Sequence, residues 1–324
     1  MQRFLLCAAA LVAGLAGAVL PAQAQENYPN RPIKIMVPIP PGGAPDVVAR
    51  LVGQYLSQAL GQPVVIENRT GANGNIAGEA VAKAAPDGYT LILAADSGIV
   101  INPHVYAKMA FDPMKDLVPV TAVATNQFVL AVNPKVPVKT LPEFVEYAKK
   151  ANPQLTFASG GVGSQHFFAM EQLKQRAGFN LLNITYRGGT PAMRATINGE
   201  TQVLFAGGES AGQFKAGTLR ALAMSGKERS KAMPDVPTIG ETYPGYSAIS
   251  WTGMLAPKGT PQPIIDRISS EMIKATKDPK FVKVLQENGI DPIAEGPEKF
   301  AAMIAAELPV WAKAVEIAGV KIQQ

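Results

Sequence analysis

The sequence predicts an α/β protein of two domains, each built around a mainly parallel sheet. Strand-like stretches rich in β-branched residues alternate with stretches whose apolar residues recur at helical spacing. A glycine-rich loop joins a strand to a helix once in each half of the chain. The length of 324 residues, with 47% hydrophobic and 17% charged, suits two globular domains of ordinary size.

Residues 1–24 are typical of a secretory signal peptide. Arg3 is their only charge, Phe4 to Leu20 is small and apolar, and Ala22-Gln23-Ala24 forms an A-x-A cleavage site. The single cysteine, Cys7, lies inside this segment. We therefore expect the mature chain to be exported without disulfides and to depend on its apolar cores for stability.

The composition argues against several classes of protein. Removal of the signal peptide takes one positive charge from the formal net charge of +5, leaving +4 (5 − 1). This mild excess lacks the clustered basic stripe of a nucleic-acid binder, so we expect no nucleic-acid partner. No other segment is long and apolar enough to span a bilayer. Two histidines without a cysteine argue against a transition-metal site, and we expect no metal and no cofactor.

The first strand–loop–helix unit is a candidate anion site. Ile33 to Val37 suits a buried strand, and helical spacing begins near Val47. Between them, Gly42 and Gly43 have no Cβ, so an anion could approach the backbone at the positive end of a helix. The alternative interpretation is a tight turn with no ligand. The loop matches neither the Walker pattern nor G-x-G-x-x-G.

Two further units follow in the first half of the chain. The second strand is expected at 63–67, with a polar loop at 68–75 and a helix at 76–85. The third strand, at 89–93, leads to Asp96-Ser97-Gly98. Ligands in open α/β sheets bind beyond the carboxyl ends of the strands, so these loops should face one crevice.

The second half repeats this organisation. The β-rich stretch from Val118 to Val132 is a candidate crossing between domains, and Thr140 with Glu143 predicts a capping box. The strand at 155–159 runs into the glycine loop 160–166 and a helix, which gives a second candidate anion site. Further strands are expected at 183–186, 202–206 and 220–225, a return crossing at 248–255, and helices at 261–276, 279–287 and 297–318.

A series of collinear motifs carries a family resemblance. These are Tyr28-Pro29-Asn30-Arg31-Pro32-Ile33, Pro41-Gly42-Gly43 with Asp46, Val64-Val65-Ile66-Glu67-Asn68-Arg69, Ala84-Ala85-Pro86-Asp87-Gly88-Tyr89-Thr90, Tyr186-Arg187-Gly188, Pro234-Asp235-Val236-Pro237-Thr238 and Trp251-Thr252-Gly253. Together they resemble the Bug family, the extracytoplasmic solute receptors of tripartite tricarboxylate transporters. The resemblance covers nearly the whole chain after the signal peptide.

The resemblance implies a periplasmic binding protein fold, with two α/β lobes, a ligand cleft between them and two hinge crossings. We expect residues 25–127 and 248–324 in lobe 1 and residues 128–247 in lobe 2, with hinges near Gln127 and Ser247. It implies a monomeric receptor, not an enzyme, for a small mono- or dicarboxylate. The expected partners are the membrane subunits of a tripartite tricarboxylate transporter or a sensor kinase.

The resemblance also implies the ligand-binding residues. In lobe 1 these are Pro41, Gly42, Gly43, Asp46, Ser97 and Asn102; in lobe 2 they are Ser159, Gly160, Gly163, Ser164, His166, Arg187 and Glu209.

Several of these residues have an alternative interpretation. Asp46 either complements the helix dipole or orders a water or a ligand. His166 either donates to a carboxylate or only begins a helix, and Arg187 is either a counter-ion or simply exposed. Glu209 either binds an ammonium or hydroxyl group of the ligand or caps the next helix. Phe167 and Phe168 are typical of core packing.

Two functions compete with transport. Gly163-Ser164-Gln165 lacks the flanks of a G-x-S-x-G nucleophile elbow, yet an exported hydrolase is recognised by the geometry of its site and not by order in the sequence. A receptor whose liganded form signals to a membrane sensor is the second alternative.

Overall fold

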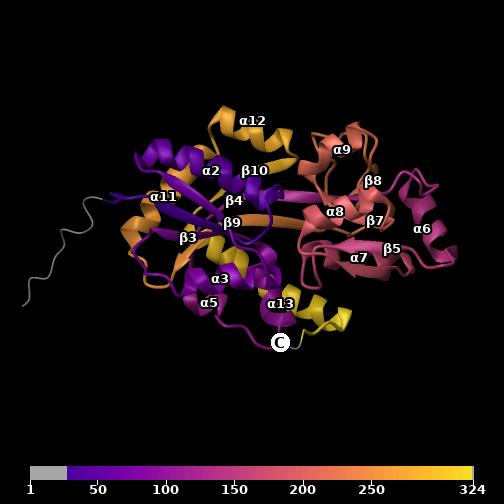
Figure 1. The fold of residues 1–324 in the computed structure, drawn as a ribbon, viewed down its shortest axis with the longest axis horizontal. Coiled ribbons are helices and arrows are strands. Elements are labelled where there is room, and N and C mark those ends of the chain that lie inside the picture. Colours follow the sequence, from indigo (N-terminus) through magenta and orange to yellow (C-terminus); the bar gives the residue numbers. More distant parts are fainter. Residues whose placement is uncertain (1–27, 323–324) are drawn as a thin grey trace, which may run out of the picture.

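The computed structural model describes residues 28–322, so the expected signal peptide lies outside the described residues. In this part of the chain, ten strands form one curled sheet in the order β2-β1-β3-β9-β4-β7-β5-β6, and β10 and β8 pair with β4 off this path. The helices cover the sheet to give two α/β lobes (Figure 1). No described helix has the length and apolarity needed to cross a membrane.

The first lobe contains the N-terminal strands and the C-terminal elements. Its strands are β1 (Ile33–Val37), β2 (Val64–Asn68), β3 (Thr90–Ala95), β9 (Ile249–Pro257), β10 (Ile290–Glu295) and the first part of β4 (Leu117–Val132). Its longer helices are α2 (Ala44–Leu60), α3 (Asn75–Ala82), α11 (Gln262–Ala275), α12 (Pro279–Glu287) and α13 (Pro297–Ala318); the short ones are η2 (Ala72–Gly74), η3 (Ser97–Ile101), α4 (Asn102–Val105) and α5 (Pro113–Asp116).

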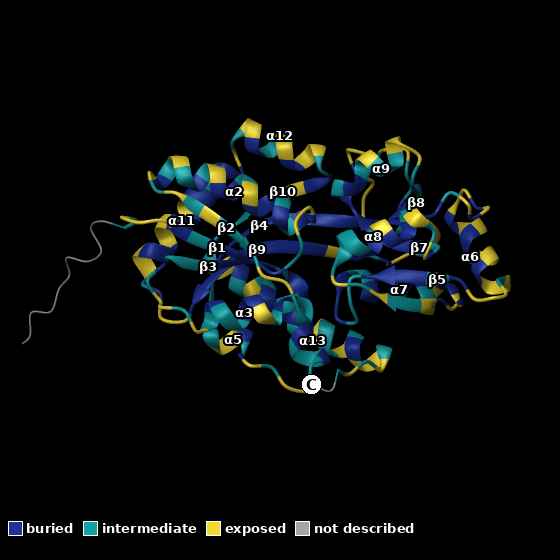
Figure 2. Ribbon diagram, in the orientation of Figure 1, coloured by how far each residue is buried: buried dark blue, intermediate teal, exposed yellow. Residues whose placement is uncertain are grey.

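The second lobe is built on the last part of β4. Its other strands are β5 (Thr156–Ser159), β6 (Leu182–Thr185), β7 (Val203–Gly207) and β8 (Arg220–Met224). Its helices are α6 (Leu141–Lys150), α7 (Gln165–Ala177), α8 (Gly189–Asn198), η4 (Gly208–Ser210), α9 (Ala211–Lys215) and α10 (Ile239–Thr242). Figure 2 shows buried strands in both lobes, and the exposed residues gather on outer helices such as α6 and α12.

Strand β4 belongs to both lobes. It pairs with β9 as far as Gln127, opposite Ile249, and with β7 from Phe128, opposite Gly207. Figure 1 shows β4 and β9 running between the lobes. The lobe boundaries and hinge positions that the sequence indicates remain predictions.

The prediction of a mainly parallel sheet is wrong. β1 pairs in parallel with β2 and β3, and β5 with β6 and β7, but all pairs made by β4 and β9 are antiparallel. These two strands carry the chain out of the first lobe and back again. They therefore run in opposite directions, and the strand pairs at the centre of the sheet are antiparallel.

Helix ends follow local sequence rules, with one correction. Helix α2 has a proline in its first turn and ends at Gly61 in the left-handed conformation. Thr140 caps α6 as predicted, but the Glu143 carboxylate accepts the Lys139 N–H at 2.7 Å, so the predicted reciprocal box is not formed.

One apolar cluster spans both lobes. Phe167 and Phe168 of α7 lie in the same buried cluster as first-lobe residues such as Phe300. The Phe168 ring contacts Trp311 of α13 edge-on, with centroids 5.6 Å apart. The start of α7 therefore packs on the first lobe, while each lobe keeps a separate core of its own.

Candidate functional site

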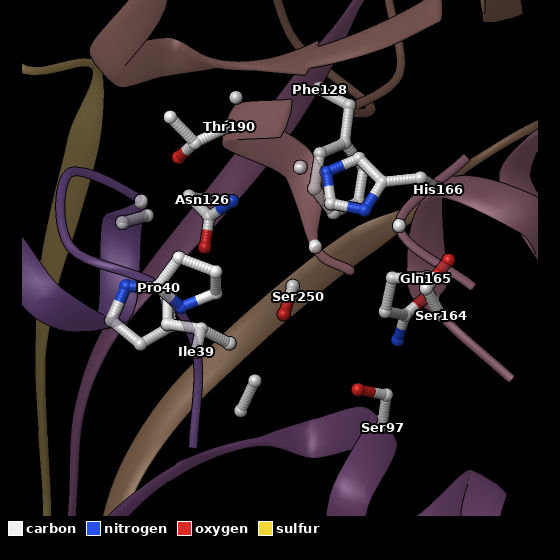
Figure 3. A pocket seen from close by; sticks show the side chains of 18 of the residues that line it. Ile39, Pro40, Ser97, Asn126, Phe128, Ser164, Gln165, His166, Thr190 and Ser250 are labelled. Atoms are coloured by element: carbon white, nitrogen blue, oxygen red, sulfur yellow. The ribbon is translucent and has the colours of Figure 1, made fainter. Parts of the chain in front are cut away.

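A cavity lies between the lobes, where the loops that follow several strands meet. It holds about 660 Å³ of space that no atom fills, part of it open to solvent. Figure 3 shows Ile39 and Pro40 of the first lobe facing Phe128 and His166, with Asn126 and Ser250 between them. Its other lining residues are Gly43, Ala44, Pro45, Asn73, Ala95, Asp96, Ser97, Gly160, Ser164, Gln165, Gly188, Gly189, Thr190, Gly207 and Glu209.

Three α-helices begin at this cavity. Gly43 and Ala44 start α2, Ser164 and Gln165 start α7, and Gly189 starts α8. The first N–H groups of a helix have no partner within the helix, and the helix dipole adds positive potential there. The sequence predicted the first two starts as anion sites, and the structure brings the third to the same cavity. Together they form an environment suited to an anion.

The α2 loop is held by Asp46. Its carboxylate accepts the Gly42 N–H at 3.0 Å, two hydrogen bonds from Arg50 and one from Asn68. Burial raises the pKa of Asp46, but these hydrogen bonds outweigh it and hold the pKa below its usual value. Gly42 has φ +93°, which favours glycine, and Asp46 fixes the loop without lining the cavity.

The start of α7 presents a capping serine and a neutral histidine. The Ser164 hydroxyl donates to the Gly161 carbonyl at 2.7 Å and accepts the Phe167 N–H, which leaves it engaged as an N-cap. The His166 ring packs against Phe128 with centroids 4.7 Å apart, and burial lowers its pKa to about 4. His166 is therefore neutral at pH 7 and can donate one hydrogen bond into the cavity.

Hydrogen bonds and tight backbone contacts join the two lobes beside the cavity. The Asn73 amide donates to the Gly163 carbonyl at 2.9 Å, and the Gln165 amide donates to the Asp96 carboxylate. A Cβ at Gly188 would lie 2.9 Å from Pro40 Cδ, so these loops meet with no room for a side chain. The two lobes are thus in direct contact beside the cavity.

Asp96 is a buried acid with many donors around it. Besides Gln165, it accepts the Ser97 N–H at 2.7 Å and the Ser250 hydroxyl at 2.8 Å. Burial and, to a smaller extent, the charge of Glu307 raise the pKa of Asp96 to about 8, although these donors oppose the shift. Asp96 therefore ties the end of β3 to β9 and to the second lobe.

The structure brings about half of the predicted residues to the cavity wall. Gly43, Ser97, Gly160, Ser164, His166 and Glu209 line it. Pro41, Gly42, Asp46, Asn102, Ser159, Gly163 and Arg187 do not. Asn102 is fully buried and accepts a hydrogen bond from the Asn73 amide, which also donates to the Gly163 carbonyl. Asn102 and Gly163 therefore lie one layer behind the wall. The Arg187 residue is exposed, outside the cavity.

Other lining residues had no clear sequence signal. Asn126 and Ser250 sit opposite each other on β4 and β9, inside stretches that resemble core strands. Phe128 and Thr190 are also absent from the predicted set. The one available signal was Asn126, a polar residue that interrupts an apolar strand and could have been read as a residue of the site. Among residues 28–322, no three His, Cys, Asp or Glu side chains are placed to hold a metal ion.

Two α/β lobes joined by crossing strands, with a cavity and three α-helix starts between them, define a solute-binding receptor. The chain belongs to the tripartite tricarboxylate transporter receptor family, TctC, whose model matches residues 48–320. The family and fold are those of receptors and not of enzymes, as predicted.

Individual relatives agree with this assignment. The protein BugT of Bordetella pertussis is 35% identical over 95% of both chains, which confirms the Bug resemblance. The structure of Rhodopseudomonas palustris Rpa4515 with adipate is 30% identical and has a TM-score of 0.89, covering 92% of this chain and 100% of that one. MatC of the same organism, with bound malate, is 30% identical with a TM-score of 0.82, covering 89% and 100%.

Proposed function

We propose that this protein is a periplasmic receptor that captures a small mono- or dicarboxylate between its lobes. It works as a monomer and delivers the ligand to the membrane subunits of a tripartite tricarboxylate transporter. The observation that carries the proposal is the convergence of three α-helix N-termini on one cavity between the lobes. Relatives bound to adipate and malate support the ligand class.

The proposed binding mode uses backbone dipoles. One ligand carboxylate accepts N–H groups from the starts of α2, α7 and α8, with a further hydrogen bond from neutral His166. Of the predicted set, the six residues that line the cavity are the proposed contacts. Pro41, Gly42, Asp46, Asn102, Ser159 and Gly163 are proposed to hold the loops that present them.

A thermal-shift screen tests the ligand class directly. We expect saturable stabilisation by aliphatic mono- and dicarboxylates and none by the matched amides, which lack the charge. A ligand at a hundred times its dissociation constant adds about 2.7 kcal/mol to the stability of the fold. Binding of no carboxylate, or equal binding of the amides, would refute the proposal.

The Gly43→Val variant tests the α2 start. A Cβ at Gly43 would lie 2.7 Å from the end of the Ile39 side chain, which itself lines the cavity. We expect Ile39 to move into the ligand space, so that binding is lost while the unfolding temperature stays close to that of the wild type. Unchanged affinity by calorimetry would count against this start as a contact.

Two measurements distinguish a transport receptor from a hydrolase and from a sensor: whether the ligand is chemically changed, and whether cells take it up. The ligand recovered unchanged after prolonged incubation excludes a hydrolase. Deletion of the gene should abolish uptake of the labelled ligand. Normal uptake with loss of a transcriptional response would favour a sensor over a transport receptor.

A further inference from the structure

The Glu209 carboxyl group has an unpaired oxygen and belongs to the cavity wall, as does the Gln165 side-chain amide, whose Oε1 atom also has no partner among the described residues. Glu209 lies in η4, directly after β7, and its Oε2 atom is buried without a hydrogen-bond partner among the described residues. Its side chain caps neither η4 nor α9, so the alternative prediction that Glu209 caps the next helix is wrong. The carboxyl folds over the backbone of Gly207, where any Cβ would overlap with it.

Asp96, the other acid of the wall, differs from Glu209. Asp96 accepts hydrogen bonds from Ser97, Ser250 and Gln165, so its oxygens are occupied by the protein. Glu209 Oε2 has no such partner. An acceptor that the protein leaves without a donor, in a residue that lines the cavity, is available to a donor on the ligand.

Within residues 28–322, the ionisable side chains of the cavity wall can supply negative charge, but none of them supplies a permanent positive charge. Among the described residues, the cavity wall includes two acids and neither lysine nor arginine. His166 is the one other titratable group of the wall, and burial keeps it neutral. Burial raises the pKa of Glu209 to about 7, opposed by its own N–H, and no neighbouring charge contributes.

We propose that Glu209 determines specificity at this site by accepting a hydrogen bond from an ammonium group on the ligand, so that the ligand is an amino-acid-type carboxylate. This inference rests on the proposed function, which places the ligand carboxylate at the helix starts. The ammonium group gives Oε2 its missing donor, and its charge offsets the acids of the wall. A fully ionised dicarboxylate instead brings a further negative charge beside Glu209.

Calorimetry on pairs of probes that differ in an amino group tests the inference. Aspartate is compared with succinate, glutamate with glutarate, and 4-aminobutanoate with butanoate, at pH 6 and pH 8. For at least one pair at pH 8, we expect the amino compound to bind about 10- to 100-fold more tightly, the range of a charged hydrogen bond. Its affinity should rise from pH 6 to pH 8 as Glu209 ionises.

The Glu209→Gln variant should abolish the preference and flatten its pH dependence, while binding of the unaminated probe is retained. Because Asp96 also titrates, the difference between wild type and Glu209→Gln isolates Glu209. Gly207→Ala, which displaces the carboxyl group, should give the same loss. Glu200→Gln, an exposed residue of the same lobe, is the matched control and should behave as wild type.

The outcomes separate the two proposals. Tight binding of dicarboxylates with no preference for any amino compound, or a preference unchanged by Glu209→Gln, would overturn the role of Glu209 and leave the carboxylate receptor intact. Binding of no probe of either kind would overturn both.

Discussion

At the scale of single residues, hydrogen bonds between side chains and backbone fix the shape of the cavity wall. Asn73 shows how this works. It adopts the left-handed conformation, with φ 50°, next to Ala72 with φ 46°, which non-glycine residues rarely do. Its amide donates to Asn102 and to the Gly163 carbonyl of the other lobe. The strain of this turn is therefore held by hydrogen bonds that include one across the cleft.

Asp46 has a comparable role, which Asp46→Asn tests. The change removes the charge that accepts hydrogen bonds from Arg50, Asn68 and the Gly42 N–H. We expect a loss of about 1–3 kcal/mol in the free energy of unfolding, measured by urea denaturation, because a buried network is left partly unsatisfied. Asp266→Asn on the exposed face of α11 is the control. Equal stability of both variants would contradict the prediction.

His166 makes stability depend on pH. Burial lowers its pKa from 6.5 to about 4, so between these values the unfolded chain binds the proton that the folded chain does not. The wild type should therefore lose stability as the pH falls from 6.5 to 4, by up to about 3 kcal/mol relative to His166→Gln, which cannot titrate there. Urea unfolding at several pH values measures the difference. Parallel pH profiles for the two proteins would refute it.

At the scale of elements, closure brings two turns together without side chains between them. Gly208 begins η4 in the second lobe, and Gly289 precedes β10 in the first. A Cβ at Gly208 would lie 2.5 Å from the Gly289 carbonyl oxygen. Since backbone atoms cannot move aside as the end of a side chain can, we expect this contact to limit how far the lobes close.

Gly208→Ala should hold the lobes apart. We expect at least about tenfold weaker ligand binding, which corresponds to about 1.4 kcal/mol, because the closed form is penalised and the open form is not. The radius of gyration of the liganded protein should stay near that of the free protein. Gly212→Ala, where an added Cβ meets nothing within 4 Å, is the control. Identical affinities for the two variants would show that the contact does not limit closure.

At the scale of the whole molecule, the sequence predicted the α/β class, most elements and both glycine loops. It was wrong on the parallel character of the sheet, since strand direction in β4 and β9 follows from where the chain crosses between lobes. It missed β10, whose Pro292 argues against a strand. It also missed Asn126 and Ser250, because their place at the cavity depends on the register between the crossing strands.

Closure as a whole should be visible in tryptophan fluorescence. The chain has two tryptophans. Trp311 of α13 lies in the first lobe and contacts Phe168 of the second, whereas Trp251 of β9 is 3% exposed and packs on Phe300 within the first lobe. Opening must change the surroundings of Trp311 much more than those of Trp251.

We therefore expect saturation with the tightest carboxylate of the screen to change the emission of the wild type and of Trp251→Phe. The same titration should leave Trp311→Phe nearly unchanged, although calorimetry still detects binding to it. The opposite assignment would mean that Trp311 and Phe168 keep their contact throughout the motion. In that case α7 would move with the first lobe, and the hinge would lie within the second lobe instead of in the crossing strands.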